Sequence, residues 1–263
     1  MPPSPRVDNR KQLSPAGYRI LPEIYDRWQV LYGSDYSALI LPRLLSTLDR
    51  IPVPEKSIVD VACGTGTLAL MMARRGWQAS GVDASPGMID ASRRKAVEFG
   101  QPVRFSCQDM RSFVLPERVG LVTSFYDSVN HLLTLRDIRS FFRSASRALR
   151  FGGLLIFDVN NEACYRKLWK GTTTMEHADF TLVLNNSYTP SRSIARSKVL
   201  VQYHGTPAQP PVSETVEERC FTHDELSRAL AREGFTLLTA EDFAFSTAPE
   251  FGKLKTWWVA RVG

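Results

Sequence analysis

The chain has 263 residues, of which 43% are hydrophobic and 23% charged, and its formal net charge is +6. A chain of this length and composition can bury a large core, and it contains neither an apolar run of membrane-spanning length nor the apolar centre of a signal peptide. The four cysteines lack paired spacing, which excludes a disulfide framework and favours free thiols and a cytoplasmic location.

The N-terminal region precedes the main pattern. Residues 1–16 are rich in proline and charge, and we expect them to be disordered. Residues 17–50 carry two apolar stripes at helical spacing and predict two helices. The stripes consist of Ile20, Leu21, Ile24, Trp28 and Leu31, and of Leu39, Ile40, Leu44, Leu45 and Leu48.

A glycine-containing turn follows the first predicted strand. Residues Ser57–Val61 form the short apolar run of a buried parallel strand, and helical spacing resumes at Thr67. Between them, Gly64 and Gly66 remove side chains where the backbone must bend sharply, beside N–H groups at the start of a helix. This pattern predicts a loop that binds a nucleotide-like ligand, although an ordinary strand–turn–helix corner also uses glycines.

A second predicted strand, Gln78–Asp83, ends in a carboxylate about 20 residues beyond the turn, where an acid can accept hydrogen bonds from a ribose. Ser85 and Pro86 then have the form of a helix N-cap and a first helical residue. Loop and acid together indicate that a nucleoside binds. As G-x-G-x-x-A, the stretch Gly64–Ala69 would bind NAD(P), which leaves an NAD(P)-dependent oxidoreductase open.

Three further motifs favour a different cofactor. Asp60–Gly66 places an acid before the glycines, Arg104–Met110 follows a third strand, and Leu121–Leu132 follows a fourth. With these motifs, residues 20–160 resemble the class I S-adenosylmethionine-dependent methyltransferases, except that Ala62 replaces the first glycine of the family's motif. Hydride chemistry would favour a Tyr-x-x-x-Lys pair, but Trp169 stands where Tyr165 would need its lysine.

The resemblance implies an α/β fold, with a Rossmann-like, seven-stranded, mostly parallel sheet and helices on both faces. It also implies S-adenosylmethionine as cofactor. Gly64 and Gly66 would hold the methionine moiety, Asp83 the ribose, and Asp109 with Met110 the adenine. The complete set of expected cofactor-binding residues is Tyr25, Asp60, Ala62, Cys63, Gly64, Gly66, Asp83, Ala84, Met88, Gln108, Asp109, Met110 and Phe125.

The expected reaction moves a methyl group to an N or O nucleophile of a small molecule by in-line displacement, which calls mainly for positioning and, for some acceptors, a base. Candidate catalytic residues are His131, Tyr126 and Asp127, with His131 as the preferred base, although a histidine that only fixes the loop would occupy the same place. Candidate substrate-binding residues are Asn130, Glu176 and Tyr203. Tyr25, Trp28 and Tyr36 are candidates for a lid over the cofactor cleft.

After the fifth strand, Leu154–Val159, the alternation of strand and helix stops at about residue 170. Extended segments without helices then predict a small antiparallel β insert over residues 171–221, which in such methyltransferases roofs the acceptor pocket. A capping box at Thr222–Glu225 opens a helix, and two strands follow. We therefore expect a core over 17–170, completed by residues 222–263.

The remaining features of the sequence favour neither a nucleic-acid partner nor a bound metal. Arg136, Arg139, Arg143, Arg147 and Arg150 lie three and four apart, which predicts a solvated arginine face on one helix, with RNA contact as the weaker alternative. Cys63 and Cys107 fit small apolar fillers at buried strand ends. The four histidines lack metal-ligand spacing, so we expect no metal. A non-catalytic cofactor-binding or RNA-associated protein stays open, as does the choice between monomer and homodimer.

Overall fold

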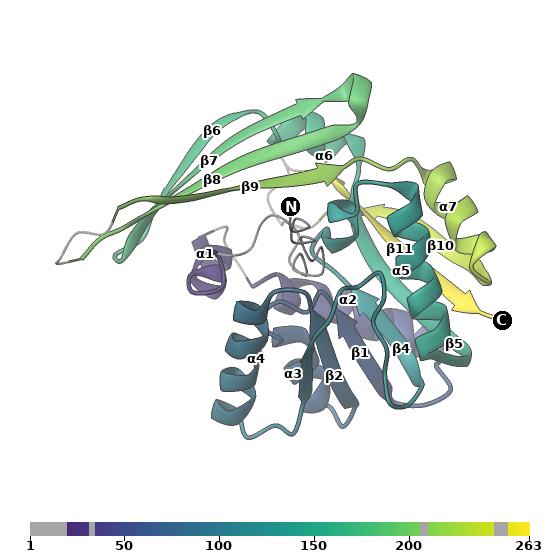
Figure 1. Cartoon of the computed structure of the whole chain (residues 1–263). Helices are drawn as coiled ribbons and strands as arrows, with labels where there is room; N and C mark the ends of the chain where they lie inside the picture. The colour runs from purple at the N-terminus through teal and green to yellow at the C-terminus, as the bar shows by residue number, and fades with distance from the viewer. Residues whose placement is uncertain (1–19, 32–34, 206–209, 245–251) are drawn as a thin grey trace, which may run out of the picture.

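The computed structural model describes residues 20–31, 35–205, 210–244 and 252–263, so the segment 1–16 expected to be disordered lies outside the described residues. Its central sheet has the order β10-β11-β5-β4-β1-β2-β3 (Figure 1). Strands β1 to β5 pair in parallel, and β11 runs antiparallel to both β5 and β10. The bounds are β1 Ser57–Val61, β2 Gln78–Asp83, β3 Arg104–Cys107, β4 Val119–Ser124, β5 Leu149–Asn160, β10 Phe235–Phe243 and β11 Lys255–Val262. The predicted seven-stranded, mostly parallel sheet is confirmed.

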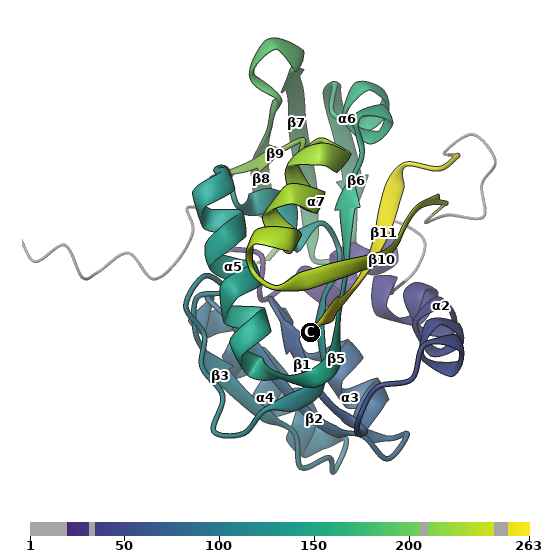
Figure 2. The same cartoon turned by 90° about the vertical axis from the view of Figure 1, so that its right-hand side faces the viewer.

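Helices cover both faces of this sheet (Figure 2). On one face lie α2 (Tyr36–Arg50) and α3 (Thr67–Ala73), with α4 (Pro86–Glu98) packed beside α3. On the other lie α5 (Leu135–Ala148) and α7 (His223–Arg232). Adjacent residues of one strand serve opposite faces: Ile58 packs in the cluster with α2, and Val59 in the cluster with α5. This explains why the central strands read as continuous apolar runs.

The helix starts follow the predicted caps. Ser85 caps α4, with Pro86 in its first turn, and Thr222 with Glu225 forms a complete capping box at α7. Thr134 also caps α5. One helix, α6 (Glu162–Leu168), was not predicted; Asn161 caps it. Gly152 lies inside β5, where the register with β4 shifts.

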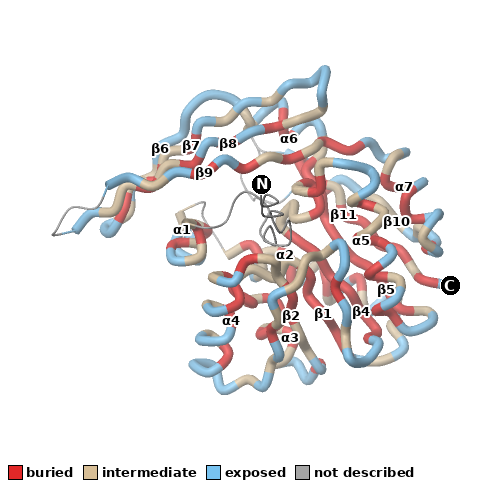
Figure 3. Tube along the Cα trace, in the orientation of Figure 1, coloured by how far each residue is buried: buried red, intermediate tan, exposed pale blue. Residues whose placement is uncertain are grey.

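The insert forms a separate four-stranded antiparallel sheet, β6-β7-β8-β9, above the main body (Figure 1). Its strands are β6 Gly171–Glu176, β7 Phe180–Thr189, β8 Ile194–Tyr203 and β9 Val212–Arg219, with a 3-10 turn, η2 (Pro190–Arg192), between β7 and β8. Alternate residues such as Leu182, Val199 and Val201 are buried, and they pack against Ile24 and the helix α1 (Tyr25–Leu31). Much of the sheet's remaining surface is exposed (Figure 3).

Helix α1 lies between the insert and the core and is bonded to both. Its Asp26 accepts a hydrogen bond from the Thr65 hydroxyl at 2.6 Å and pairs with Lys95 at 2.7 Å. On the insert side, Arg27 pairs with Asp179 at 2.6 Å. These contacts hold α1 directly beside the glycine loop.

Two predictions about the surface need correction. Arg150 is a residue of β5, where it pairs with Glu55, so it does not continue the arginine face of α5. Arg139 and Arg143 both pair with Glu233, so part of that face is bonded within the chain. Cys107 is exposed because β3 is the edge strand of the sheet.

Within the described ranges, no helix has the length and apolar character needed to cross a membrane.

Candidate functional site

A cavity of about 550 Å³ opens at the carboxyl ends of the parallel strands, where ligands bind in open α/β sheets. The glycine loop and the segments after β2, β3 and β4 form its floor and sides, and β9 of the insert contributes to its wall. Of the predicted site residues, the structure brings Tyr25, Ala62, Gly64, Asp83, Ala84, Met88, Gln108, Asp109, Met110, Tyr126 and His131 to this lining.

The glycine loop is bonded to the acid at the end of β2. The Gly64 N–H donates to Asp83 Oδ2 at 2.9 Å, and the Ser85 N–H donates to Asp83 Oδ1 at 2.8 Å. Burial raises the pKa of Asp83, while these two backbone bonds oppose that rise. Each oxygen of a carboxylate has a second lone pair, so Asp83 can still accept two hydroxyl bonds from the cavity side.

The loop needs left-handed backbone at three positions, with φ of 57° at Ala62, 53° at Gly64 and 80° at Gly66. At Ala62 this conformation costs about 1–2 kcal/mol, because its Cβ is crowded there. Gly66 is not among the cavity-lining residues; a Cβ there would lie 2.6 Å from the Phe105 ring, so its small size serves the packing of the loop on β3.

At the far end of the cavity, Asp109 is held by Arg111. The guanidinium contacts both carboxylate oxygens, at 2.5 to 3.0 Å, and also pairs with Asp137 at 3.3 Å. Although partial burial opposes it, this contact lowers the pKa of Asp109. Gln108 bonds Val114 and Ser106, which fixes the loop after β3.

A smaller cavity of about 50 Å³ lies behind the first and shares Tyr25, Ala62, Gly64, Tyr126 and Ser128 with it. Asp60, Cys63 and Phe125 line this second space. Burial raises the pKa of Asp60 to about 7, against a 2.7 Å hydrogen bond donated by Thr123. Phe125 also stacks on Trp257, with ring centroids 4.8 Å apart.

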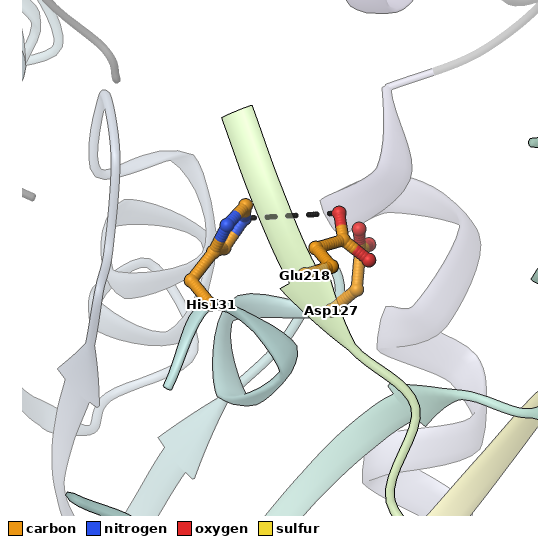
Figure 4. Close-up of side chains that lie close together, drawn as sticks. All are labelled: Asp127, His131 and Glu218. Carbon is orange, nitrogen blue, oxygen red and sulfur yellow. Dashed lines mark ion pairs between the residues drawn. The ribbon is translucent and has the colours of Figure 1, made fainter. Parts of the chain in front are cut away.

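A polar cluster lies at the wall between η1 (Ser128–His131) and β9, where Asp127, His131 and Glu218 come together (Figure 4). One ligand atom from each lies within 4.8 Å of the other two, a spacing that could hold a cation. His131 Nε2 is 3.9 Å from Glu218 Oε1, and its Nδ1 contacts the Glu217 carbonyl at 3.2 Å. Burial lowers the pKa of His131, although Asp127 opposes that change, and the lowered pKa favours the neutral ring at pH 7. The expectation of no metal stays a prediction.

Behind this cluster lies a buried ion-pair network. Lys255 of β11 is 2.8 Å from Asp127 and 3.8 Å from Asp158. The Tyr36 hydroxyl donates to Asp158, and the Tyr36 ring stacks on Tyr126 at 4.6 Å. Tyr36, a lid candidate, is therefore a member of this network. Tyr126 and Asp127 have φ of 60° and 55°, and two adjacent residues in this strained region commonly mark a functional loop.

The structure does not bring the predicted substrate-binding residues to the cavity. Asn130 is fully buried; its amide donates to the Arg219 carbonyl at 2.8 Å and accepts from the Asn160 N–H at 2.9 Å. Glu176 is exposed at the end of β6 and bonds Thr181. Tyr203 packs at the edge of the apolar cluster around α1. Both insert residues lie outside the lining of either cavity described above.

Replacing Asn130 by alanine is expected to lower the free energy of unfolding by about 2–3 kcal/mol, because a buried N–H and a carbonyl lose their partner. Urea denaturation measures this loss. Asn185→Ala, at an exposed position of β7, is the control. Stability equal to the wild type would contradict the structural role of Asn130.

Sequence reasoning missed Arg111, Asp158, Glu218 and Lys255. One feature of the sequence could have pointed to Lys255: this charged residue begins a run of apolar and aromatic strand residues. In β9, polar residues occupy both faces, so the alternation could not show that Glu218 is buried (2% exposed) while its neighbour Glu217 is not.

Comparison with known proteins gives consistent matches. Residues 58–153 match a family model described as "Methyltransferase domain". A protein of Bacillus subtilis (strain 168) named "Putative methyltransferase YqeM" is 30% identical over 189 residues, covering 70% of this chain and 76% of the relative.

Two other curated relatives match over about half their length or less. A ubiquinone biosynthesis O-methyltransferase of Methylobacterium sp. (strain 4-46) is 36% identical, covering 39% of this chain and 40% of the relative. The dTDP-3-amino-3,4,6-trideoxy-alpha-D-glucopyranose N,N-dimethyltransferase of Streptomyces venezuelae is 28% identical, covering 52% and 55%. Among solved structures, an S-adenosylmethionine-dependent methyltransferase from Clostridium acetobutylicum ATCC 824 superposes with a TM-score of 0.77 at 20% identity, covering 94% of this chain and 99% of that one.

Proposed function

The chain belongs to the class I S-adenosylmethionine-dependent methyltransferases, with S-adenosylmethionine as its cofactor, and we propose that it methylates an amine nitrogen of a small molecule. The observation that carries this proposal is the charge of the cavity wall. Four lining residues are carboxylates, namely Asp83, Asp109, Asp137 and Glu217, whereas Arg111 is the one lining residue that is lysine or arginine. Arg111 pairs with Asp109 and Asp137, and Arg196 pairs with Glu217, so the wall still keeps an excess of negative charge. Such a wall attracts an ammonium and repels phosphate or carboxylate acceptors.

The residues present fit the cofactor. A volume of about 550 Å³ is within the range of about 300–1,000 Å³ that small-molecule sites occupy. Asp83 retains acceptor capacity for the ribose, and the thioether side chains of Met88 and Met110 offer apolar surface for the adenine. Gly64, Ala62 and the smaller cavity beside Asp60 would receive the methionine end. When bound, the cofactor supplies an activated methyl group on a sulfonium.

Replacing Asp83 by alanine is expected to weaken binding of S-adenosylmethionine more than tenfold, since the ribose contacts and the bond to the Gly64 N–H are lost together. Titration calorimetry measures the affinity. Asp90→Ala removes an exposed carboxylate from α4 and is the control. An unchanged affinity for the Asp83 variant would refute its assignment to the ribose.

The protein's own contribution to the reaction follows from the position of His131. An amine at neutral pH enters mainly as its ammonium, which has no lone pair for attack. The ring of His131 is neutral and lines the cavity, so it can accept that proton and leave the nitrogen nucleophilic. Tyr126 and the neighbouring loop position the acceptor, and α1 with the insert reduces access of water to the site.

The test is a transfer assay with a panel of primary and secondary amines, phenols and carboxylic acids, preceded by calorimetry with S-adenosylmethionine, S-adenosylhomocysteine and NADH. We expect micromolar binding of the first two ligands, none of NADH, and methyl transfer to amines. Transfer to phenols alone would move the proposal to an oxygen acceptor. Binding of NADH alone would contradict the cofactor itself.

A further inference from the structure

The network behind the cavity wall contains more acid than base. Asp127 lies close to both Asp158 and Glu218, and among the described residues Lys255 is the lysine or arginine paired with Asp127 and Asp158. Lys255 and Glu218 are each 2% exposed, and Asp158 is fully buried. Three ionised carboxylates would leave two negative charges uncompensated, and burial of such charge is strongly unfavourable.

Hydrogen bonds indicate which carboxyl group carries a proton. Burial raises the pKa of Asp158, but the hydrogen bonds from the Asp127 N–H at 2.8 Å and from Tyr36, together with the nearby Lys255, oppose that rise and favour its ionised form. Asp127 is paired directly with Lys255. Glu218 accepts on Oε2 from Tyr165 at 2.7 Å and from Asn160 at 3.0 Å, and one of its carboxyl oxygens lies within 4.8 Å of a carboxyl oxygen of Asp127. Two carboxyl groups can bond only when one of them supplies the hydrogen.

We propose that Glu218 is a positioning residue for methyl transfer that acts as a neutral carboxylic acid, with its O–H donated to Asp127. The link to methyl transfer rests on the proposed function, whereas the protonation of Glu218 does not depend on that function. The shared proton ties β9 of the insert to the loop after β4, and it leaves one net negative charge beside His131. That charge favours the imidazolium formed when His131 accepts the acceptor's proton.

The remaining groups agree with this assignment. Burial, with the nearby Asp127, raises the pKa of Glu218 well above its usual value. Lys255, against the effect of burial, lowers the pKa of Asp127. Tyr36, Tyr165 and Cys164 also face the network, and burial raises the pKa of each, so they add no charge at neutral pH. A divalent cation is the competing source of positive charge, but the Lys255 ammonium already lies 2.8 Å from Asp127.

The first experiment compares the folding equilibrium of the wild type and Glu218→Gln between about pH 5.5 and 7.5, above the pKa of about 4.3 for a glutamate in the unfolded chain. In this range the folded wild type holds one proton that the unfolded chain has lost. Its folding constant relative to Glu218→Gln should therefore fall about tenfold for each pH unit as pH rises. Glu217→Gln, at a half-buried position beside Glu218 on β9 where the side chain pairs with Arg196 of β8, controls for loss of a carboxylate. A ratio independent of pH would overturn the proposal.

The same comparison separates a proton from a metal. Addition of MgCl₂, MnCl₂ or ZnCl₂ should change the Tm of the wild type and the Tm of Glu218→Gln by the same amount. A rise in Tm that is seen for the wild type and lost in Glu218→Gln would show a cation site and overturn the neutral acid. Neither measurement needs cofactor or acceptor, so both outcomes stand apart from the failure of the proposed function.

The link to transfer is tested with an amine from the panel. Glu218→Gln keeps a neutral donor toward Asp127, so kcat/KM should stay within about threefold of the wild type. The acid limb of the pH profile, where kcat/KM falls as pH is lowered, should stay at the same pH. Glu218→Leu removes the donor, and kcat should fall more than tenfold at unchanged affinity for S-adenosylmethionine. An acid limb that shifts down by a full pH unit in Glu218→Gln would show that Glu218 acts as an anion.

Discussion

Replacing Lys255 by methionine is expected to lower the free energy of unfolding by about 3–5 kcal/mol at pH 7.5, which makes it the most destabilising single change we predict. The substitution keeps the volume of the side chain but removes the cation that compensates Asp127 and Asp158. Two buried carboxylates then face one another without a counter-charge. Urea denaturation of the two proteins measures the difference.

The pH dependence of this variant has a defined sign. Without Lys255, the pKa values of the two carboxyl groups rise above those of the unfolded chain, so the folded state binds protons that the unfolded state does not. Stability of Lys255→Met should therefore increase as pH falls toward about 5, relative to the wild type. Lys253→Met, at an exposed position two residues earlier, is the matched control. A loss below about 1 kcal/mol for Lys255→Met would show that the pairs contribute little.

Replacing His131 by glutamine is expected to lower kcat for an amine acceptor about 100-fold, the lower end of what general base catalysis contributes. Glutamine can still donate to the Glu217 carbonyl, so the loop after β4 remains bonded to β9. It cannot accept a proton at neutral pH. Affinity for S-adenosylmethionine should be unchanged, since the side chains expected to contact the cofactor are retained.

The pH profile separates a base from a residue that only fixes the loop. Burial lowers the pKa of His131, so the wild-type kcat/KM should be retained above that pKa and lost as pH falls through it, below the usual value of about 6.5. The glutamine variant should lose this acid limb. His204→Gln, exposed at the end of β8, provides the control. Full activity in His131→Gln would assign the residue to loop structure alone.

The sequence predicted those parts of the molecule that depend on short-range patterns. The glycine turn, the strand ending at Asp83 and the caps at Ser85 and Thr222 are local, and each has the predicted structure. The insert was recognisable because helical spacing stops at about residue 170. Asp83 and Gly64 could be paired in advance because parallel strands bring their carboxyl ends to one edge.

The polar network depends on contacts that no local pattern encodes. Lys255 and Asp127 are 128 residues apart, and Tyr36 and Asp158 are 122 apart. Asn130 illustrates this: its position beside the fourth-strand motif suggested a substrate contact, whereas the structure bonds both polar atoms of its amide to β9 and β5. Glu218 is buried and the adjacent Glu217 is not, and this difference likewise depends on how the insert packs against the core.

Within the part of the chain that the structure describes, the insert and the central sheet share no strand pairing, although both supply walls to one cavity. The glycine loop, Asp83 and the residues after β3 lie in the core, whereas Thr215, Val216 and Glu217 come from β9. Substitutions along β9 can thus reshape one wall while the others keep their form. Descendants of this chain could therefore exchange one acceptor for another in small steps, without passing through a form that has lost its methyl donor.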